Sequence, residues 1–336
     1  MGVKLTDIVP IKKITFEDLS NKVVAVDSSN MLYQFLSSIR QRDGTPLMDS
    51  HGSVTSHLVG LFSRIPNIME KNIKPAFVFD GKPPALKFKE RERRAERKTM
   101  AEQKYAEAER DLDSDEMLKY SKQFTKLDKD MVTEAKKLLS AMGLPVIQAP
   151  SEAEAQCAYI CKQKGAWAAV SQDFDTLLYG TPRLLRSLTL STKKRMPSGG
   201  YVKVTPELIE LKEVLKELEL DQKQLIVLSI LVGTDYNIGG VKGIGPKKAL
   251  KLVQSGQKFE KIFEELDPSF DWKEIYDVFD KMPIEKEYDL KFTEPDDEEI
   301  KKILVDKHEF SEERVNSTLE RLRPKPKDQQ DLKKWF

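Results

Sequence analysis

The sequence predicts an α/β fold with a central, mostly parallel sheet that is flanked by helices. Two short apolar segments, residues 22–27 and 74–80, are typical of buried strands, and each of them ends on an aspartate. Between them, residues 31–40 and 55–71 carry apolar side chains at helical spacing, and a Gly-Lys-Pro-Pro sequence breaks the chain directly after residue 80. This strand–helix–strand order indicates a parallel sheet covered by helices.

The same alternation resumes after residue 128. Further elements are expected as helices at 129–142, 150–164 and 220–231 and as strands at 143–147, 167–171, 184–190 and 201–204. The intervening residues 85–128 are nearly all charged or helix-forming, so they bury little apolar surface, and we expect a protruding or mobile helical segment there. From about residue 256 the chain is mostly amphipathic helix, and after residue 323 it becomes polar and rich in proline.

Composition narrows the class of protein. The 336 residues are 39% hydrophobic, enough for a large core, and the formal net charge of +1 indicates no particular partner. Cys157 and Cys161 lie four residues apart in an apolar helical pattern, so we expect reduced, buried thiols in an intracellular protein. No apolar run reaches about 18 residues, so no membrane span is expected. The segment MGVKLT fits a loose myristoylation pattern, but no second membrane signal lies nearby.

Carboxylates follow three of the predicted strands. Asp27 and Asp80 end the first two, and residues 167–171 lead into Asp173 and Asp175, which share a face only if the strand continues. Open α/β sheets bind ligands at the carboxyl ends of their strands, so these side chains are expected to meet. Carboxylates that meet there repel one another, and a divalent cation relieves the repulsion. Oxygen ligands favour Mg²⁺ or Mn²⁺, so the pattern indicates a divalent-metal site.

Three more acidic residues are candidates for that site, and each has a structural alternative. Ser151 and Glu154 have the spacing of a helix capping box, and Glu152 would complement the helix dipole. Residues two apart on a helix point in roughly opposite directions, so spacing alone does not bring both glutamates to one site. Asp235, in Val-Gly-Thr-Asp-Tyr, could instead cap a turn. The residues alone leave ligand and capping roles open.

Several segments resemble the signature blocks of the flap endonuclease family. They are MGVKL, VDSSNMLYQFL, FDGKPP, APSEAEAQCAY, SQDFDTLLYG and LVGTDYNIGGVKGIGPKKAL, and they follow the family's order over residues 1 to about 255. The resemblance implies a structure-specific 5′ flap endonuclease with 5′–3′ exonuclease activity in DNA replication and repair. It also implies that seven carboxylates bind two Mg²⁺ ions, with Mn²⁺ as a substitute: Asp27, Asp80, Glu152, Glu154, Asp173, Asp175 and Asp235. Two metal ions roughly 4 Å apart would hydrolyse a phosphodiester in line, without a covalent nucleophile, leaving a 5′-phosphate and a 3′-hydroxyl.

A basic stripe follows the second aspartate strand. Residues 87–98 read KFKERERRAERK, and Lys87, Arg91, Arg94 and Lys98 recur at helical spacing. The stripe could be a solvated face with internal ion pairs such as Glu90 with Arg94. Beside a carboxylate cluster, it could instead attract phosphate and share transition-state charge. The resemblance identifies it with the helical gateway beneath the family's arch, and it implies catalytic roles for Lys87 and Arg94.

Residues 239–248 predict a glycine-rich hairpin between two helices. Its glycines let backbone N–H groups approach phosphates closely, and a helix begins near Pro246, although a purely structural turn is the alternative. The segment resembles the family's helix-hairpin-helix, which also holds K⁺, and the residues implied to contact DNA are Gly240, Gly243, Gly245, Lys247 and Lys248. The resemblance further implies that Tyr33, otherwise a core tyrosine, stacks on a base, and that Arg40 and Thr55 lie near a pocket for a 3′ flap.

The last residues of the sequence place an aromatic pair on a polar, proline-containing tail. A terminal Trp-Phe pair is unusual there unless it is bound, and the alternative is a segment that folds back on the body. The spacing resembles a sliding-clamp-binding peptide with the anchors Gln329, Leu332, Trp335 and Phe336. No basic extension follows, which looks more archaeal than eukaryotic. The expected partners are flapped or nicked duplex DNA and the clamp. A monomer is expected, in the cytoplasm and nucleoid if archaeal or in the nucleus if eukaryotic.

The resemblance divides the chain into five parts. These are residues 1–80 and 129–255 as the nuclease core, 81–128 as gateway and arch, 256–323 as a C-terminal helical region and 324–336 as a flexible tail. Three other functions fit parts of the sequence. A phosphatase with an aspartate nucleophile would use Asp173 or Asp175, a non-catalytic DNA scaffold would bind the clamp, and a related nuclease would cut bubbles or Holliday junctions.

Overall fold

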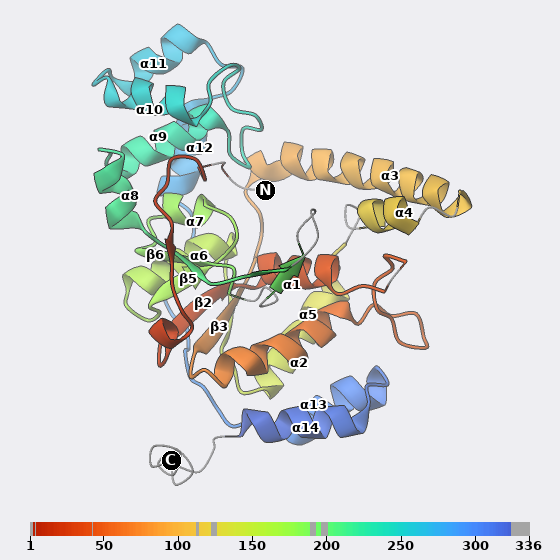
Figure 1. The fold of residues 1–336 in the computed structure, drawn as a ribbon. Helices are drawn as coiled ribbons and strands as arrows, with labels where there is room; N and C mark the ends of the chain where they lie inside the picture. Colours follow the sequence, from red (N-terminus) through yellow and green to blue (C-terminus); the bar gives the residue numbers. More distant parts are fainter. Residues whose placement is uncertain are drawn as a thin grey trace.

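The fold is built around a seven-stranded sheet (Figure 1). The computed structural model describes residues 3, 5–41, 43–111, 114–121, 126–188, 193–195 and 201–323. The strands of the sheet are β1 (Lys12–Lys13), β2 (Val23–Asp27), β3 (Lys74–Phe79), β4 (Val146–Gln148), β5 (Ala168–Val170), β6 (Arg183–Arg186) and β9 (Glu207–Glu210). Their order is β1-β9-β6-β5-β2-β3-β4. Strands β2 to β6 pair in parallel, and β9 is antiparallel to both of its neighbours, β6 and β1. The predicted mostly parallel α/β fold is therefore confirmed.

Different helices cover the two faces of the sheet. Helices α1 (Ser28–Ser38), α2 (Ser56–Met69) and α5 (Lys129–Ala141) lie on one face, and α6 (Ala153–Lys162) lies on the other. Successive strand residues point to opposite sides, so Val24 and Val26 of β2 join the core of the first face. Ala25, between them, packs with Cys157 and Cys161 of α6. Both thiols are free and buried, as predicted.

A second helical group lies above the sheet in Figure 1 and shares a core with its β6 end. It consists of α7 (Asp175–Leu178), α8 (Leu211–Glu217), α9 (Gln222–Val232), α10 (Pro246–Gln254), α11 (Phe259–Leu266) and α12 (Trp272–Asp280). Helix α9 is its centre, because residues 225–231 are all buried. A capping box between Asp221 and Gln224 starts this helix.

Helices α3 (Phe88–Arg110) and α4 (Ser114–Ser121) project to one side of the body and pack against each other (Figure 1). After the short turn η2 (Ala85–Lys87), α3 continues for 23 residues with a very polar composition. Only three of its described side chains are buried, namely Glu90, Ala101 and Ala108. The predicted protruding helical segment is confirmed over these residues.

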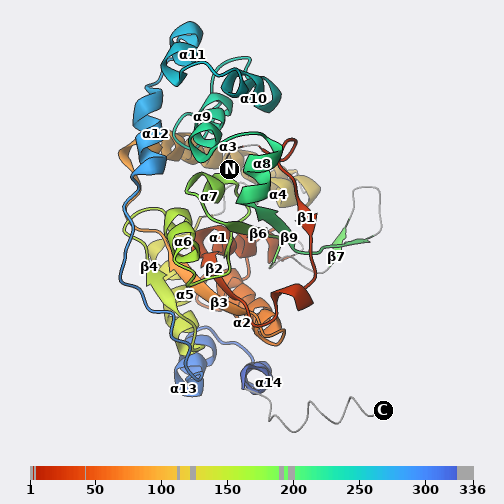
Figure 2. The same cartoon turned by 90° about the vertical axis from the view of Figure 1, so that its left-hand side faces the viewer.

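The C-terminal helices lie below the sheet. They are α13 (Asp297–Lys301), the π-helical turn η3 (Lys302–Lys307) and α14 (Glu312–Leu322). Helix α13 packs against α5, and α14 packs against α2. Residues 281–296 have no helix, so the expectation of mostly amphipathic helix after residue 256 is wrong for this segment. The segment contains Pro283 and Pro295 and runs as an extended connection from α12 to α13 (Figure 2).

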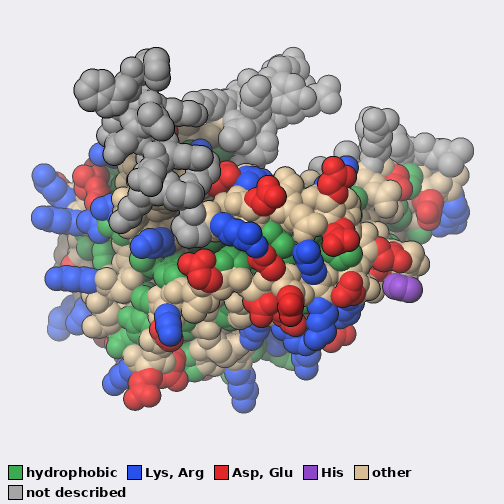
Figure 3. Space-filling model, turned by 90° about the horizontal axis from the view of Figure 1, so that it is seen from below, with side chains coloured by type: hydrophobic (Ala, Val, Ile, Leu, Met, Phe, Trp, Pro, Cys, Tyr) green, Lys and Arg blue, Asp and Glu red, His purple; other side chains and the backbone are tan. Residues whose placement is uncertain are grey.

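Other differences from the predicted elements are small. The apolar pattern missed the short strands β1, β9 and β7 (Lys193–Arg195). Strand β7 forms a separate hairpin with β8 (Tyr201–Lys203), which was predicted at 201–204. The strand predicted at 184–190 corresponds to β6, which ends at Arg186. The short helix η1 (Glu17–Leu19) precedes β2. On the face in Figure 3, basic and acidic side chains are interspersed, in keeping with the near-neutral sequence. The described helices include none that could cross a membrane.

Candidate active site

A pocket of about 690 Å³ opens at the carboxyl ends of β2, β3 and β5. Strand order changes direction at β2, because the chain adds β3 and β4 on one side of it and β5 and β6 on the other. Ligands bind at such switch points in α/β sheets. The pocket is lined by all seven predicted carboxylates and by two predicted cations: Asp27, Asp80, Glu152, Glu154, Asp173, Asp175, Asp235, Lys87 and Arg94.

Asp27 and Asp173 are held together by an asparagine. Asp27 ends β2, is 7% exposed and accepts a 3.1 Å hydrogen bond from the backbone N–H of Asn30. The Asn30 side chain donates to Asp173 Oδ2 at 3.1 Å and accepts from the backbone N–H of Gln172 at 3.2 Å. Burial and the nearby Asp80 charge raise the pKa of Asp27 well above its ordinary value. Asn30 thus joins the end of β2 to the turn after β5.

Asp80 and Asp175 each accept a backbone N–H from a distant segment. The Oδ1 atom of Asp80 accepts from Ala153 at 2.7 Å, at the start of α6. The Oδ1 atom of Asp175 accepts from Val3 at 2.8 Å, which brings the N-terminal segment to the site. Burial and Asp235 raise the pKa of Asp175 to about 7. Strand β5 ends before both aspartates, so Asp173 lies in a turn and Asp175 begins α7.

Glu152 and Glu154 both reach the pocket, because Glu152 precedes the helix. Its backbone is extended, with φ −78° and ψ 129°, at the N-cap of α6, so the opposite-face rule of a helix does not apply. The predicted capping box is wrong, since the Ser151 hydroxyl donates to the Lys82 carbonyl at 2.9 Å instead. The Oε1 atom of Glu154 accepts hydrogen bonds from the hydroxyls of Ser171 and Thr176, at 3.0 and 3.2 Å. Burial and Asp175 raise its pKa well above the ordinary value.

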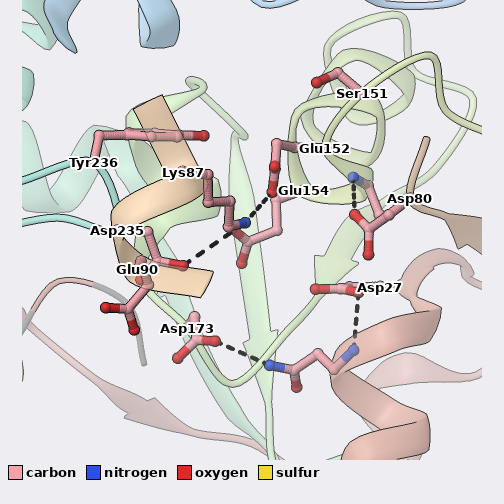
Figure 4. A network of polar contacts seen from close by, with 12 residues as sticks. Asp27, Asp80, Lys87, Glu90, Ser151, Glu152, Glu154, Asp173, Asp235 and Tyr236 are labelled. Atoms are coloured by element: carbon pink, nitrogen blue, oxygen red, sulfur yellow. Dashed lines mark hydrogen bonds and ion pairs between the residues drawn. The ribbon is translucent and has the colours of Figure 1, made fainter. Parts of the chain in front are cut away.

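Two cations from the basic stripe face the carboxylates. Lys87 Nζ lies 2.5 Å from Glu152 Oε2 and 3.7 Å from Asp235 Oδ2 (Figure 4). Burial alone would lower the pKa of Lys87, but these carboxylates outweigh it and raise the pKa, so the ammonium stays charged. Arg94 Nη2 lies 2.8 Å from Asp235 Oδ2. The alternative in which Asp235 only caps a turn is wrong, because its carboxylate binds both cations.

The glycine hairpin adjoins α10. Gly240 and Gly243 have φ values of +60° and +78°, which favour glycine. A Cβ on Gly240 would lie 2.3 Å from the Leu231 carbonyl oxygen, so this glycine is needed for packing, whereas the space beside Gly243 is open. Helix α10 begins at Pro246 as predicted, Lys247 is exposed, and Lys248 Nζ donates to the Gly243 carbonyl at 3.1 Å. Gly245, the N-cap of α10, likewise has open space beside it.

Comparison with known proteins gives a consistent result. Sequence models of the XPG N-terminal domain and the XPG I-region match residues 1–101 and 143–235. Flap endonuclease 1 of Pyrococcus horikoshii is 52% identical over 340 residues, covering 100% of this chain and 98% of that protein. Flap endonuclease 1 of Thermococcus onnurineus is 50% identical over 339 residues, with coverages of 100% and 99%. This chain belongs to the flap endonuclease family.

Solved structures agree with this assignment. Flap endonuclease-1 from Methanococcus jannaschii superposes with a TM-score of 0.77 at 45% identity, over 96% of this chain and 98% of that one. The catalytic core of Rad2 in complex with a DNA substrate gives a TM-score of 0.71 at 25% identity, with coverages of 96% and 100%. The flap endonuclease is a DNA-binding nuclease of replication and repair, and not a phosphatase or a non-catalytic scaffold.

The remaining predicted DNA-contacting residues of the flap endonuclease lie in different places. Tyr33 is 41% exposed and lines the pocket, so the core-tyrosine alternative is wrong. Lys98 Nζ lies 5.7 Å from the centroid of its ring. Arg40 and Thr55 are at the two ends of the α1–α2 loop, outside the pocket lining, where Arg40 donates to the Gly44 carbonyl and Thr55 is buried. The clamp-motif residues lie outside the described residues: Gln329, Leu332, Trp335 and Phe336.

Sequence reasoning missed the polar residues that hold the carboxylates. Asn30, Ser171 and Thr176 bind them directly. Asn30 lies three residues after Asp27, in the first turn of the helix that follows β2, and this spacing was an available signal. Ser171 is the last residue of the strand predicted at 167–171 and directly follows β5, and this position was available as well.

Proposed function

We propose that this flap endonuclease removes 5′ flaps by hydrolysing a phosphodiester with two Mg²⁺ ions, leaving a 5′-phosphate and a 3′-hydroxyl. It would also act as a 5′–3′ exonuclease. The observation that carries the proposal is the joint lining of one pocket by seven carboxylates and by the cations of Lys87 and Arg94. The carboxylates suit cations, and the two basic side chains suit the phosphate of the substrate.

The donor set fits hard divalent cations. Every predicted ligand is a carboxylate. Burial and mutual repulsion raise the pKa of Asp27, Glu154 and Asp175, and bound cations would relieve this repulsion. In this conformation, the described residues include no group of three His, Cys, Asp or Glu side chains arranged to hold one ion. Glu152 and Asp235 instead contact Lys87 and Arg94. We infer that these two carboxylates turn toward the ions when metal and substrate enter. The ions would supply an activated water and stabilise the leaving oxygen.

Lys87 and Arg94 would then bind the scissile phosphate. Both side chains stay charged, and both lie within 4 Å of a carboxylate oxygen that the ions would take over. Once released from that oxygen, each cation would compensate the negative charge that grows on the phosphate in the transition state. Lys87 and Arg94 would therefore contribute more to the rate of the chemical step than to the affinity for the substrate.

DNA would be bound by shape along three surfaces. Tyr33 would stack on the base beside the scissile bond, because its exposed ring faces the pocket. The hairpin would contact duplex phosphates through Gly240, Gly243 and Gly245 and through the charges of Lys247 and Lys248, with K⁺ held by the hairpin. Arg40 and Thr55 would help to hold a 3′ flap, from the ends of the α1–α2 loop.

The remaining proposals concern the whole protein. The tail anchors Gln329, Leu332, Trp335 and Phe336 would bind the sliding clamp. The five-part division of the chain, with the boundaries given by the sequence, would separate nuclease core, arch, C-terminal helices and tail. We also propose a monomer that acts inside the cell, in the cytoplasm and nucleoid if the source is archaeal.

Cleavage of a substrate panel tests the proposed function. The substrates are 5′-flap, double-flap, nicked, bubble and four-way DNA, with Mg²⁺ and with or without a sliding clamp. We expect 5′-flap and double-flap substrates to be cut fastest, with a ligatable nick as product. Faster cutting of bubbles or four-way junctions would contradict the flap preference, and cutting that persists in a chelator would contradict the metal dependence.

A further inference from the structure

Arg94 is held from two sides in this structure. Its Nη2 donates to Asp235 Oδ2 at 2.8 Å, and its Nε donates to Glu90 Oε1 at 2.7 Å. The guanidinium is planar with donors in fixed directions, so two carboxylates at Nε and Nη2 fix both the position and the orientation of the group. An arginine side chain that is held at one point only would keep much of its rotamer freedom.

The two carboxylates differ in what they face. Asp235 lines the pocket and is one of the predicted metal ligands, whereas Glu90 is absent from the pocket lining. Glu90 is only 4% exposed, although it belongs to the very polar helix α3. It lies one helical turn before Arg94, and Arg93 Nη1 is 4.0 Å from its other oxygen, Oε2. Glu90 therefore binds Arg94 from outside the lining of the pocket.

We propose that Glu90 is a positioning residue that keeps Arg94 aimed at the pocket during the reaction. The inference rests on the proposed function, in which Asp235 leaves Arg94 to bind a metal ion. At that moment Glu90 is the carboxylate that still holds the guanidinium. The charge of Arg94 can then follow the phosphate, because its Nη atoms are free to donate while Nε stays bound.

The burial of Glu90 makes this arrangement demanding. A buried carboxylate is costly unless it is paired, and the hydrogen bond to Arg94 occupies Oε1, while Oε2 is buried and accepts no hydrogen bond from the described residues. A glutamate whose only purpose was solubility of α3 would be exposed, as Glu92 and Glu96 are. The structure keeps a buried acid at this position, and its well-aligned partner is the predicted catalytic arginine.

The test is a double-mutant cycle of Glu90→Ala and Arg94→Ala, measured by single-turnover cleavage of a 5′-flap substrate with Mg²⁺ and by substrate affinity without turnover. We expect Glu90→Ala to slow cleavage on the order of tenfold to a hundredfold, with nearly unchanged affinity, because a misplaced catalytic group costs this much. In the Arg94→Ala background, Glu90→Ala is expected to cause no further slowing. Glu90→Gln is expected to restore most of the rate, since its side-chain oxygen still accepts from Nε.

Two controls separate positioning from folding. Glu92→Ala removes the same charge from an exposed site two residues away, and it is expected to leave the rate unchanged. The melting temperature of each variant reports whether α3 stays packed. Two results would overturn the role of Glu90 and leave the proposed role of Arg94 intact. In the first, Glu90→Ala slows cleavage equally in the presence and in the absence of Arg94. In the second, Glu90→Ala causes no slowing although Arg94→Ala does. An Arg94→Ala variant of full activity would overturn the proposed role of Arg94 and this inference with it.

Discussion

At the scale of residues, the site depends on side chains that hold other side chains. Asp27 and Asp173 come from sequence positions far apart, and the carboxamide of Asn30 bridges them. Glu154 depends in the same way on two hydroxyls, and Arg94 depends on Glu90. Partners of this kind orient metal ligands and fix their distances, so their loss weakens metal binding without removing a ligand.

Asn30→Ala tests this dependence. Asp173 would lose its fixed position, so we expect the Mg²⁺ concentration for half-maximal cleavage to rise about tenfold or more, with activity recovering at high Mg²⁺. A Mg²⁺ titration of flap cleavage provides the measurement. Ser29→Ala is the matched control, since Ser29 is adjacent and also lines the pocket. An unchanged Mg²⁺ dependence in Asn30→Ala would show that Asp173 is positioned without it.

At the scale of elements, the α1–α2 loop is fastened to the C-terminal helices by a buried polar cluster. The Nδ1 atom of His308, which follows η3, lies 2.7 Å from Asp49 Oδ2, and its Nε2 atom lies 3.1 Å from Glu134 Oε1. Glu309 accepts hydrogen bonds from the N–H and hydroxyl of Ser50. The loop that carries Arg40 and Thr55 at its ends is therefore held in place by residues from about 250 positions later in the chain.

His57 of α2 gives this cluster a pH dependence. Its side chain is fully buried, and burial lowers its pKa to about 4, against the opposing influence of Glu134 and Asp128 and with a further lowering by His308. The unfolded chain binds a proton at its ordinary pKa of 6.5, so the folded state loses stability as pH falls from 6.5 to 4. The loss is about 3 kcal/mol over that window, at 1.36 kcal/mol per unit.

Urea unfolding between pH 4 and 7 measures this effect. We expect His57→Gln to flatten the slope of unfolding free energy against pH in that window. His51→Gln is the control, because His51 is exposed in the same loop. If His57→Gln kept the wild-type slope, the buried neutral imidazole would not be its cause.

The hairpin before α10 is a second element with a measurable contribution. Lys247 is exposed at the start of α10, and Gly243 leaves open space beside it. Lys247→Ala is expected to weaken binding of every flap sequence equally and to reduce the salt slope of log affinity by about 1, the signature of one lost phosphate contact. Lys261→Ala, on α11, is the control. An unchanged salt slope for Lys247→Ala would place the duplex elsewhere.

At the scale of the whole molecule, we expect the nuclease site and the proposed clamp-binding tail to be separable. The pocket and hairpin lie within residues 1–255, whereas the proposed clamp anchors fall at residues 329–336 of the sequence. Removal of residues 328–336 is therefore expected to abolish stimulation by the clamp and leave basal flap cleavage unchanged. Cleavage assays with and without a clamp measure both. Stimulation of the shortened protein would mean that the clamp binds another surface.

The sequence predicted much of this arrangement because strand ends are local features. Asp27 and Asp80 follow apolar strands directly, and parallel strands bring their carboxyl ends to one edge. Glu152 and Glu154 were ambiguous, because only the extended backbone at Glu152 turns both toward the pocket. Asn30 was missed as a positioning residue, since only tertiary packing brings its partner Asp173 to it. The Glu90–Arg94 pair follows from its spacing, but the sequence did not show that Glu90 is buried or that Arg94 also contacts Asp235. The extended segment 281–296 was missed because its packing against Gly143 and Gln156 is also tertiary.

We propose that the carboxylates of this pocket are required for flap cleavage because they hold divalent cations. Asp173→Ala tests it most directly, in single-turnover cleavage of a 5′-flap substrate over a range of Mg²⁺ concentrations. We expect flap binding to persist and cleavage to fall by at least a hundredfold, because the loss of a metal ligand removes much of the transition-state stabilisation. Undiminished cleavage by Asp173→Ala with Mg²⁺ would contradict the account.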